Sequence, residues 1–224
     1  MPIISKQGRT TYLFGSLILL ALVFLLAFHG PILARAGRYM APITTDSADV
    51  LILAGNNTIS KAGLHEGMTL LSHGRANRLV VVLLYPLLSG QDSALERECA
   101  RLISHESLRL GVKEERSSVI SVPIAGHPIT RSEAILVTDK LHGDGVRSAI
   151  LLSDGFHTRR SIAAYRQEAS RLGLNIVPRA HFNGYDCDSW WTTSKGINDF
   201  VKESSKFVYY LARGYLPITS LWRL

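Results

Sequence analysis

The sequence predicts an α/β fold: a three-layer Rossmann-like domain on a mostly parallel five-stranded sheet, preceded by one transmembrane helix. Short apolar runs alternate with amphipathic stretches five times, at intervals that suit right-handed crossovers. A long uncharged apolar segment lies near the start of the chain. We therefore expect a membrane anchor over residues 1–34, a linker over 35–47, the α/β domain over 48–216 and a tail over 217–224.

The anchor is predicted by residues Tyr12–Phe28, which are almost entirely hydrocarbon, within the uncharged stretch Thr10–Ala34. A helix needs roughly 20 such residues to cross a bilayer. A cleaved signal peptide is the alternative, because Lys6 and Arg9 form a basic start and Ala34-Arg35-Ala36 is a weak cleavage site. The distribution of basic residues favours a cytoplasmic N-terminus, which places the domain outside the cytoplasm.

The first half of the domain is expected to contain two strands and two helices. Ala48–Ala54 is a short apolar run that ends at a glycine, as buried parallel strands do, and Ser60–His73 follows with helical spacing. Arg78–Tyr85 is a second apolar strand. Ser93–Leu110 carries leucines at helical spacing, and Gly111 is a typical helix stop.

The second half is expected to continue the alternation. Gly173 is predicted to end the fourth helix, and Pro178 to lie on an edge strand because proline lacks an N–H. The expected strands are Ser118–Ile124, Ala149–Leu152 and Leu174–Arg179, and the expected helices are Arg131–Leu141, a helix ending at Leu172, and Gly196–Arg213.

The charge of the chain indicates its partners. The net charge is +7; beyond residue 34 there are 23 basic and 18 acidic residues, a balance of +5. A basic domain beside a membrane is attracted to anionic head groups and phosphate-bearing lipids. We therefore expect the lipid bilayer and an anionic or phosphate-bearing small molecule or lipid as partners. Nucleic acid is not expected, because the basic residues are scattered without a recognition motif.

Metal ions and cofactors are not expected. The histidines show no metal-ligand spacing, and the chain has no GxSxG, Walker A or GxGxxG motif. The two cysteines, Cys99 and Cys187, lie far apart; one disulfide is an alternative, but the helical pattern around Cys99 favours a buried free thiol.

Polar residues gather where the fourth strand meets its helix. Ser153, Asp154, His157 and Arg160 lie within eight positions there. A histidine at a helix start suits acid–base chemistry or phosphate contact, and an arginine suits an anion clamp. Of the adjacent pair Arg159 and Arg160, one must face away from the ligand. Ser153 or Thr158 as a helix cap is the structural alternative.

Two other loops are expected at the same edge of the sheet. Gly55 and Asn56 follow the first strand and offer backbone N–H groups, although taken alone they are better explained by a plain tight turn. Thr130 and Glu133, in the sequence TRSE, match a capping box, in which both side chains serve only to begin a helix.

The order of these motifs resembles the SanA/YdcF-like (ElyC-like) family of envelope proteins. The matching segments are ADVLILAGNN, TISKAGLHEGMTLLSHG, ITRSEA, ILLSDGFHTRRS and GINDFVKESSKFVYYLARGYL. The resemblance implies a family pocket lined by Gly55, Thr130, Glu133, Ser153, His157 and Arg160. Two departures from the family pattern are Asn56, where a second glycine is usual, and Ser132, where an acidic residue is usual.

The resemblance also implies a function. The chain is expected to be a single-pass protein of the bacterial inner membrane, with a periplasmic domain that binds or processes a phosphate-bearing envelope metabolite or lipid carrier. His157 and Glu133 are the expected catalytic residues, and Gly55, Asn56, Thr130, Ser153, Asp154 and Arg160 the expected ligand-binding residues. The alternatives are a non-catalytic envelope factor or partner-binding module, and a binder of a nucleotide or an S-adenosylmethionine-like ligand.

Overall fold

The structure is a computed structural model that describes residues 16, 29–56, 60–86, 92–124, 126 and 128–222. The expected membrane span, Tyr12–Phe28, lies outside these residues except for Ser16. None of the helices in the described ranges is long and apolar enough to cross a membrane.

The predicted sheet is confirmed. Its five strands form the order β3-β2-β1-β4-β5, and every neighbouring pair is parallel. The strands are β1 (Ala48–Asn56), β2 (Ala76–Pro86), β3 (Ser117–Ile124), β4 (Ser148–Asp154) and β5 (Asn175–His181). β5, which contains Pro178, is an edge strand as expected.

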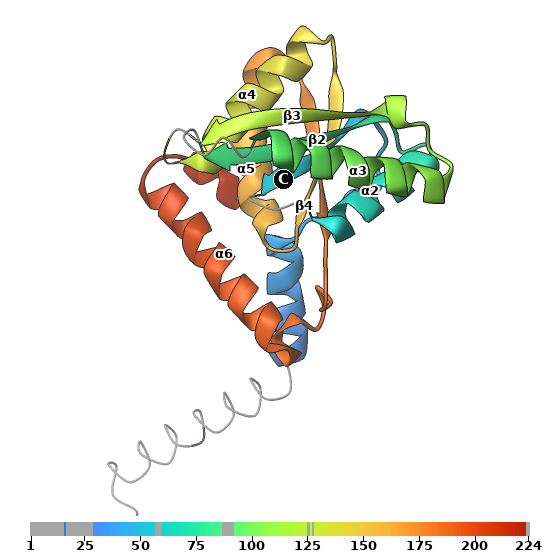
Figure 1. Ribbon diagram of the computed structural model, residues 1–224. Coiled ribbons are helices and arrows are strands. Elements are labelled where there is room, and N and C mark those ends of the chain that lie inside the picture. The colour runs from blue at the N-terminus through green and yellow to red at the C-terminus, as the bar shows by residue number, and fades with distance from the viewer. Residues whose placement is uncertain are drawn as a thin grey trace, which may run out of the picture.

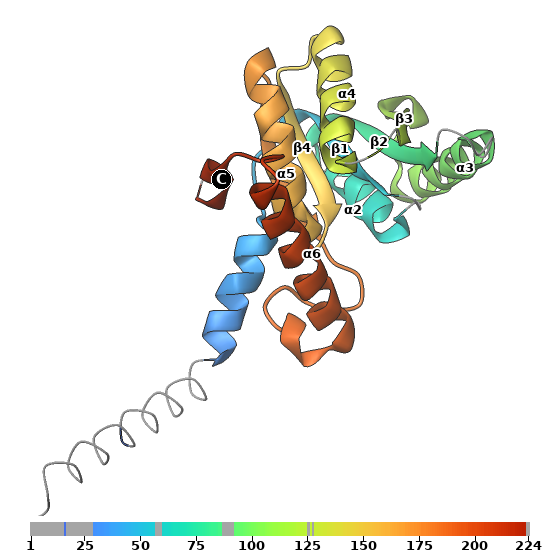
Figure 2. The ribbon, with the colours of Figure 1, turned by 90° about the vertical axis from the view of Figure 1, so that its left-hand side faces the viewer.

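Helices cover both faces of the sheet, which confirms the three layers (Figures 1 and 2). Because strand residues alternate between faces, Leu51 and Leu53 pack with one set of helices while Val50 and Ile52 pack with the other. The first set is α2 (Lys61–Ser72) and α3 (Asp92–Leu110). The second is α4 (Ile129–Gly143), α5 (His157–Ala169) and α6 (Ser194–Ala212).

The predicted helix ends are also confirmed. Gly111 and Gly173 both have a φ of 66°, a left-handed backbone that glycine adopts without a steric penalty. After α5 ends, one short 3₁₀ turn, Ser170–Leu172, precedes Gly173. Cys99 is buried and Cys187 is half-buried, and both are free thiols.

Residues 29–34, expected to belong to the anchor, and the segment expected to be a linker, 35–47, are part of the folded domain. Residues 29–40 are helical and lie against the segment before α6, where the Trp190 indole N–H donates to the Leu33 carbonyl over 2.9 Å (Figures 1 and 2). Further on, Met40 is buried, and the Thr44 N–H donates to the Pro178 carbonyl over 2.8 Å. Burial of these side chains therefore extends the domain to before residue 48.

The expected C-terminal tail is docked as well. The 3₁₀ helix Ile218–Leu221 lies against Arg159, whose Nη2 donates to the carbonyls of Ser220 and Leu221 over 2.8 Å each. The guanidinium of Arg159 also lies 4.0 Å from the ring centre of Tyr39, which donates to the Leu221 carbonyl. One buried arginine thus holds the helix of residues 29–40 and the end of the chain together.

Candidate functional site

The polar residues lie at the topological switch point of the sheet. From β1 the chain moves outward through β2 and β3, then returns to place β4 on the other side of β1. A crevice opens outside the carboxyl ends of the two strands at such a point, and ligands of open α/β sheets bind there. Here β1 ends with Gly55 and Asn56, and β4 ends with Ser153 and Asp154.

Two adjoining pockets lie at this edge. The main pocket, of about 390 Å³, contains five of the expected site residues among its lining, and the side pocket measures about 160 Å³. The two pockets share the side chains of His157, Arg160, Lys202 and Lys206. The five expected residues of the main pocket are Gly55, Thr130, Glu133, His157 and Arg160.

The other expected site residues are placed differently. Asp154 lines the side pocket. Ser153 is buried and lines neither pocket, and its Oγ has no hydrogen-bond partner within the described ranges. Asn56 ends β1, and its side chain lies outside the described part of the structure.

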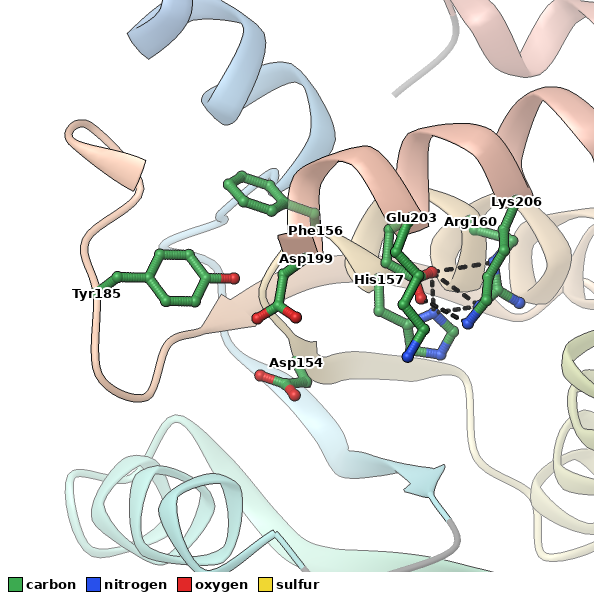
Figure 3. A pocket seen from close by; sticks show the side chains of 9 residues that line it. Asp154, Phe156, His157, Arg160, Tyr185, Asp199, Glu203 and Lys206 are labelled. Carbon is green, nitrogen blue, oxygen red and sulfur yellow. Dashed lines mark hydrogen bonds and ion pairs between the residues drawn. The ribbon is translucent and has the colours of Figure 1, made fainter. Parts of the chain in front are cut away.

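Arg160 is the centre of the site, on the first turn of α5. Its Nη1 donates to Thr130 Oγ1, and its Nη2 donates to Glu203 Oε2 over 2.9 Å. The same Nη2 lies 2.9 Å from His157 Nδ1, as Figure 3 shows. The neighbouring Arg159 points to the C-terminal residues, which confirms that only one of the two arginines faces the site.

Nδ1 of His157 lies between a donor and an acceptor, 2.9 Å from Arg160 Nη2 and 3.3 Å from Glu203 Oε2. Arginine has only donors, so the contact with Arg160 is a hydrogen bond when Nδ1 is unprotonated. The proton then lies on Nε2, which is 2.9 Å from Ser161 Oγ. Burial and the charge of Arg160 lower the pKa of His157, although Glu203 opposes them. Both ring nitrogens are thus engaged by protein groups.

Helix α6 also contributes side chains to the site, and the sequence did not predict this contribution. Glu203 accepts from Arg160 and, through Oε1, from Lys206 Nζ over 2.8 Å. Burial alone would raise the pKa of Glu203, but its contacts with His157, Arg160 and Lys206 outweigh burial and hold that pKa far below its ordinary range. The available signal was the spacing of Asp199, Lys202, Glu203 and Lys206 on one helical face.

The prediction that Thr130 and Glu133 form a capping box is wrong. Pro128 occupies the position before α4 and no side chain caps the helix. Instead Glu133 is buried, and its Oε1 accepts from the Gly55 N–H over 2.8 Å and from the Tyr165 hydroxyl over 2.9 Å. Tertiary partners replace the local cap because both side chains face the crevice rather than the first turn of their helix.

The carboxyl of Glu133 holds its proton unusually tightly. Burial raises its pKa to about 7, against the opposing effects of the Gly55 N–H, the Tyr165 hydroxyl and the charge of Arg160. No hydrogen bond joins its second oxygen, Oε2, to any described residue. Gly55 must be glycine, since a Cβ there would lie 2.8 Å from Leu84 Cγ.

An aromatic cluster positions α6 over the site. Phe156, directly before α5, is 1% exposed, and its ring centre lies 5.1 Å from Phe200 of α6. Trp190 stacks on Phe200 at 4.0 Å and lies 5.8 Å from Phe156. These contacts fix the start of α6 against the start of α5, which brings Glu203 to Arg160.

Together these residues define a basic, partly buried site at the switch point of a parallel α/β sheet. Among the residues placed by the structure, no group of three or more His, Cys, Asp or Glu side chains is arranged to hold a metal ion. Comparisons of the chain with protein-family models, curated proteins and solved structures found no match.

Proposed function

We propose that the protein binds a phosphate-bearing ligand in the main pocket, with Arg160 as its main contact. The observation that carries the proposal is the position of Arg160, a residue 5% exposed that lines the pocket between α4, α5 and α6. Its bonds to Glu203, His157 and Thr130 leave one Nη1 hydrogen without a described partner. Guanidinium groups held in this way bind phosphate well.

The walls of the main pocket favour a phosphate attached to an apolar group. Lys202 and Lys206 add positive charge beside Arg160. Apolar and aromatic side chains form another part of the lining: Leu84, Ile129, Tyr209 and Tyr210. A phosphorylated lipid carrier combines both properties, in agreement with the resemblance to SanA/YdcF-like envelope proteins.

Hydrolysis of the phosphate ester is the reaction we propose. Water attacks phosphorus, the ester P–O bond breaks, and the leaving alcohol takes up a proton. Glu133 suits proton transfer, because a pKa of about 7 allows it to accept and donate near neutral pH. His157 has both nitrogens engaged, so its proposed role is to hold Arg160 in position.

Binding and phosphate release from farnesyl phosphate test this proposal. The full chain, in a neutral detergent, is expected to bind farnesyl phosphate but not farnesol, and to release inorganic phosphate. Glu133→Gln is expected to stop release and preserve binding. Equal binding of the phosphate and the alcohol would refute the proposed site.

Other results of the same binding and release measurements would support one of the two alternative functions. Binding without release in the wild type would make the protein a non-catalytic envelope factor. Tight binding of adenosine monophosphate or S-adenosylmethionine, with no binding of farnesyl phosphate, would favour a nucleotide-type ligand.

The proposed location is the extracytoplasmic side of the bacterial inner membrane, with Tyr12–Phe28 as the anchor. The proposal is supported by the uncharged apolar run and by the basic residues that precede it. Alkaline phosphatase fused after Leu224 is expected to be active, since it matures only outside the cytoplasm. Activity of a cytoplasmic reporter at the same position would overturn the topology.

A further inference from the structure

The side pocket has opposite charges at its two ends. Figure 3 shows Asp154 and Asp199 toward one side, with Arg160, Glu203 and Lys206 on the other. Tyr185 lines the acidic end, and Lys202 adds a further positive charge to the lining. Such a cavity complements a ligand that carries charges of both signs.

Pairing within the protein leaves one charge of each sign unmatched in this pocket. Glu203 is paired with Arg160 and Lys206, and Asp199 is paired with Lys195 over 2.9 Å. Lys202 and Asp154, by contrast, form no ion pair or hydrogen bond with any residue in the described ranges. A bound ligand would therefore meet an available cation at one end and an available carboxylate at the other.

The acidic end already accommodates an ammonium group. Lys195 Nζ lies 4.7 Å from the ring centre of Tyr185 while it donates to Asp199. A carboxylate beside an aromatic face is a common environment for ammonium groups. An ammonium can form an ion pair with Asp154, which a neutral hydroxyl cannot, so an ammonium is the better match.

We propose that the ligand is an aminoalkyl phosphate, with its phosphate on Arg160, Lys202 and Lys206 and its ammonium group on Asp154. This inference rests on the proposed function, because the phosphate is the group already assigned to Arg160. It adds the chemical class of the substituent that reaches into the side pocket.

Two ligands of nearly equal shape test the inference: 2-aminoethyl phosphate and n-propyl phosphate, which differ by an ammonium in place of a methyl group. By calorimetry on the full chain in neutral detergent, the amine is expected to bind about tenfold more tightly, the size of one charge-assisted hydrogen bond. Asp154→Asn is expected to abolish this preference, so that the two phosphates bind the variant equally tightly.

The matched control is Asp139→Asn, which removes the same charge from an exposed site on α4 that lines neither pocket. It is expected to keep the tenfold preference. Equal binding of the two phosphates would overturn the inference and leave the proposed function standing, whereas no binding of these two phosphates or of farnesyl phosphate would overturn the proposed function itself. Tighter binding of glycerol 1-phosphate than of the amine would assign a hydroxylated group instead, against the inference.

Discussion

Replacing Glu133 with glutamine is expected to stabilise the protein by about 3 kcal/mol at pH 8 and to leave its stability near pH 4.5 unchanged. The folded protein holds the proton of Glu133 to a pKa of about 7, whereas the unfolded chain loses it near the ordinary value of 4.5. Proton binding therefore favours the folded state below pH 4.5, and this stabilisation is lost as the pH rises to 7. Glutamine does not titrate, and its carbonyl still accepts from Gly55 and Tyr165.

Urea unfolding of the full chain between pH 4.5 and 8 measures this difference. The gap between variant and wild type is expected to grow through this range and then to level off. Tyr165→Phe removes a donor that favours the ionised carboxylate of Glu133. The pKa of Glu133 should therefore rise further, and the pH range over which the difference grows should extend to higher pH. The control is Glu98→Gln, which removes a carboxylate from an exposed ion pair with Arg101 and should change the free energy of unfolding little. A difference that is independent of pH would contradict the raised pKa of Glu133.

Replacing Arg160 with methionine is expected to weaken the binding of farnesyl phosphate about 100-fold, which corresponds to roughly 3 kcal/mol. Methionine preserves the approximate length of the side chain and removes every guanidinium donor to the phosphate, while Lys202 and Lys206 remain. It also leaves Glu203 with fewer partners, a costly change for a carboxylate that is largely buried. The double variant Arg160→Met with Glu203→Gln relieves that cost and keeps the measurement interpretable if the single variant unfolds.

The neighbouring arginine provides the matched control. Arg159→Met removes the same charge one residue away, from a side chain that contacts the C-terminal residues rather than either pocket. It is expected to lower the melting temperature while the affinity stays within about twofold. Equal loss of affinity in both variants would contradict a direct contact between Arg160 and the phosphate.

Sequence patterns predict most of the fold because the period of the apolar residues is a local property. The run Ala149–Leu152 identifies β4, and the left-handed glycines after α3 and α5 mark ends that the structure confirms. The edge of the sheet that carries the site follows from the same pattern, since parallel strands place their carboxyl ends together. Gly55 and Arg160 were found in this way, whereas Glu133 was expected in the pocket only from the resemblance to the SanA/YdcF-like family.

The remaining features depend on contacts between residues far apart in the chain. Glu203 reaches Arg160 only because Phe156, Trp190 and Phe200 fix α6 against α5. The sequence TRSE matches a local cap, yet Glu133 bonds to Gly55, 78 positions earlier. The helix of residues 29–40, which spans the end of the expected anchor and the start of the expected linker, is docked because Trp190 bonds to Leu33 and Arg159 contacts Tyr39, and neither lies near it in the sequence.

Under the proposed topology, the docking of residues 29–40 affects how far the pocket can move from the bilayer. A flexible tether would let the domain sample many heights and orientations above the bilayer. Residues 29–40 instead form a helix of about 18 Å that Trp190 fixes to the domain, so they do not provide a flexible tether. Under the proposed topology the domain would begin directly after the anchor, so the pocket would stay close to the bilayer and ligands would reach it by diffusing sideways within the membrane surface.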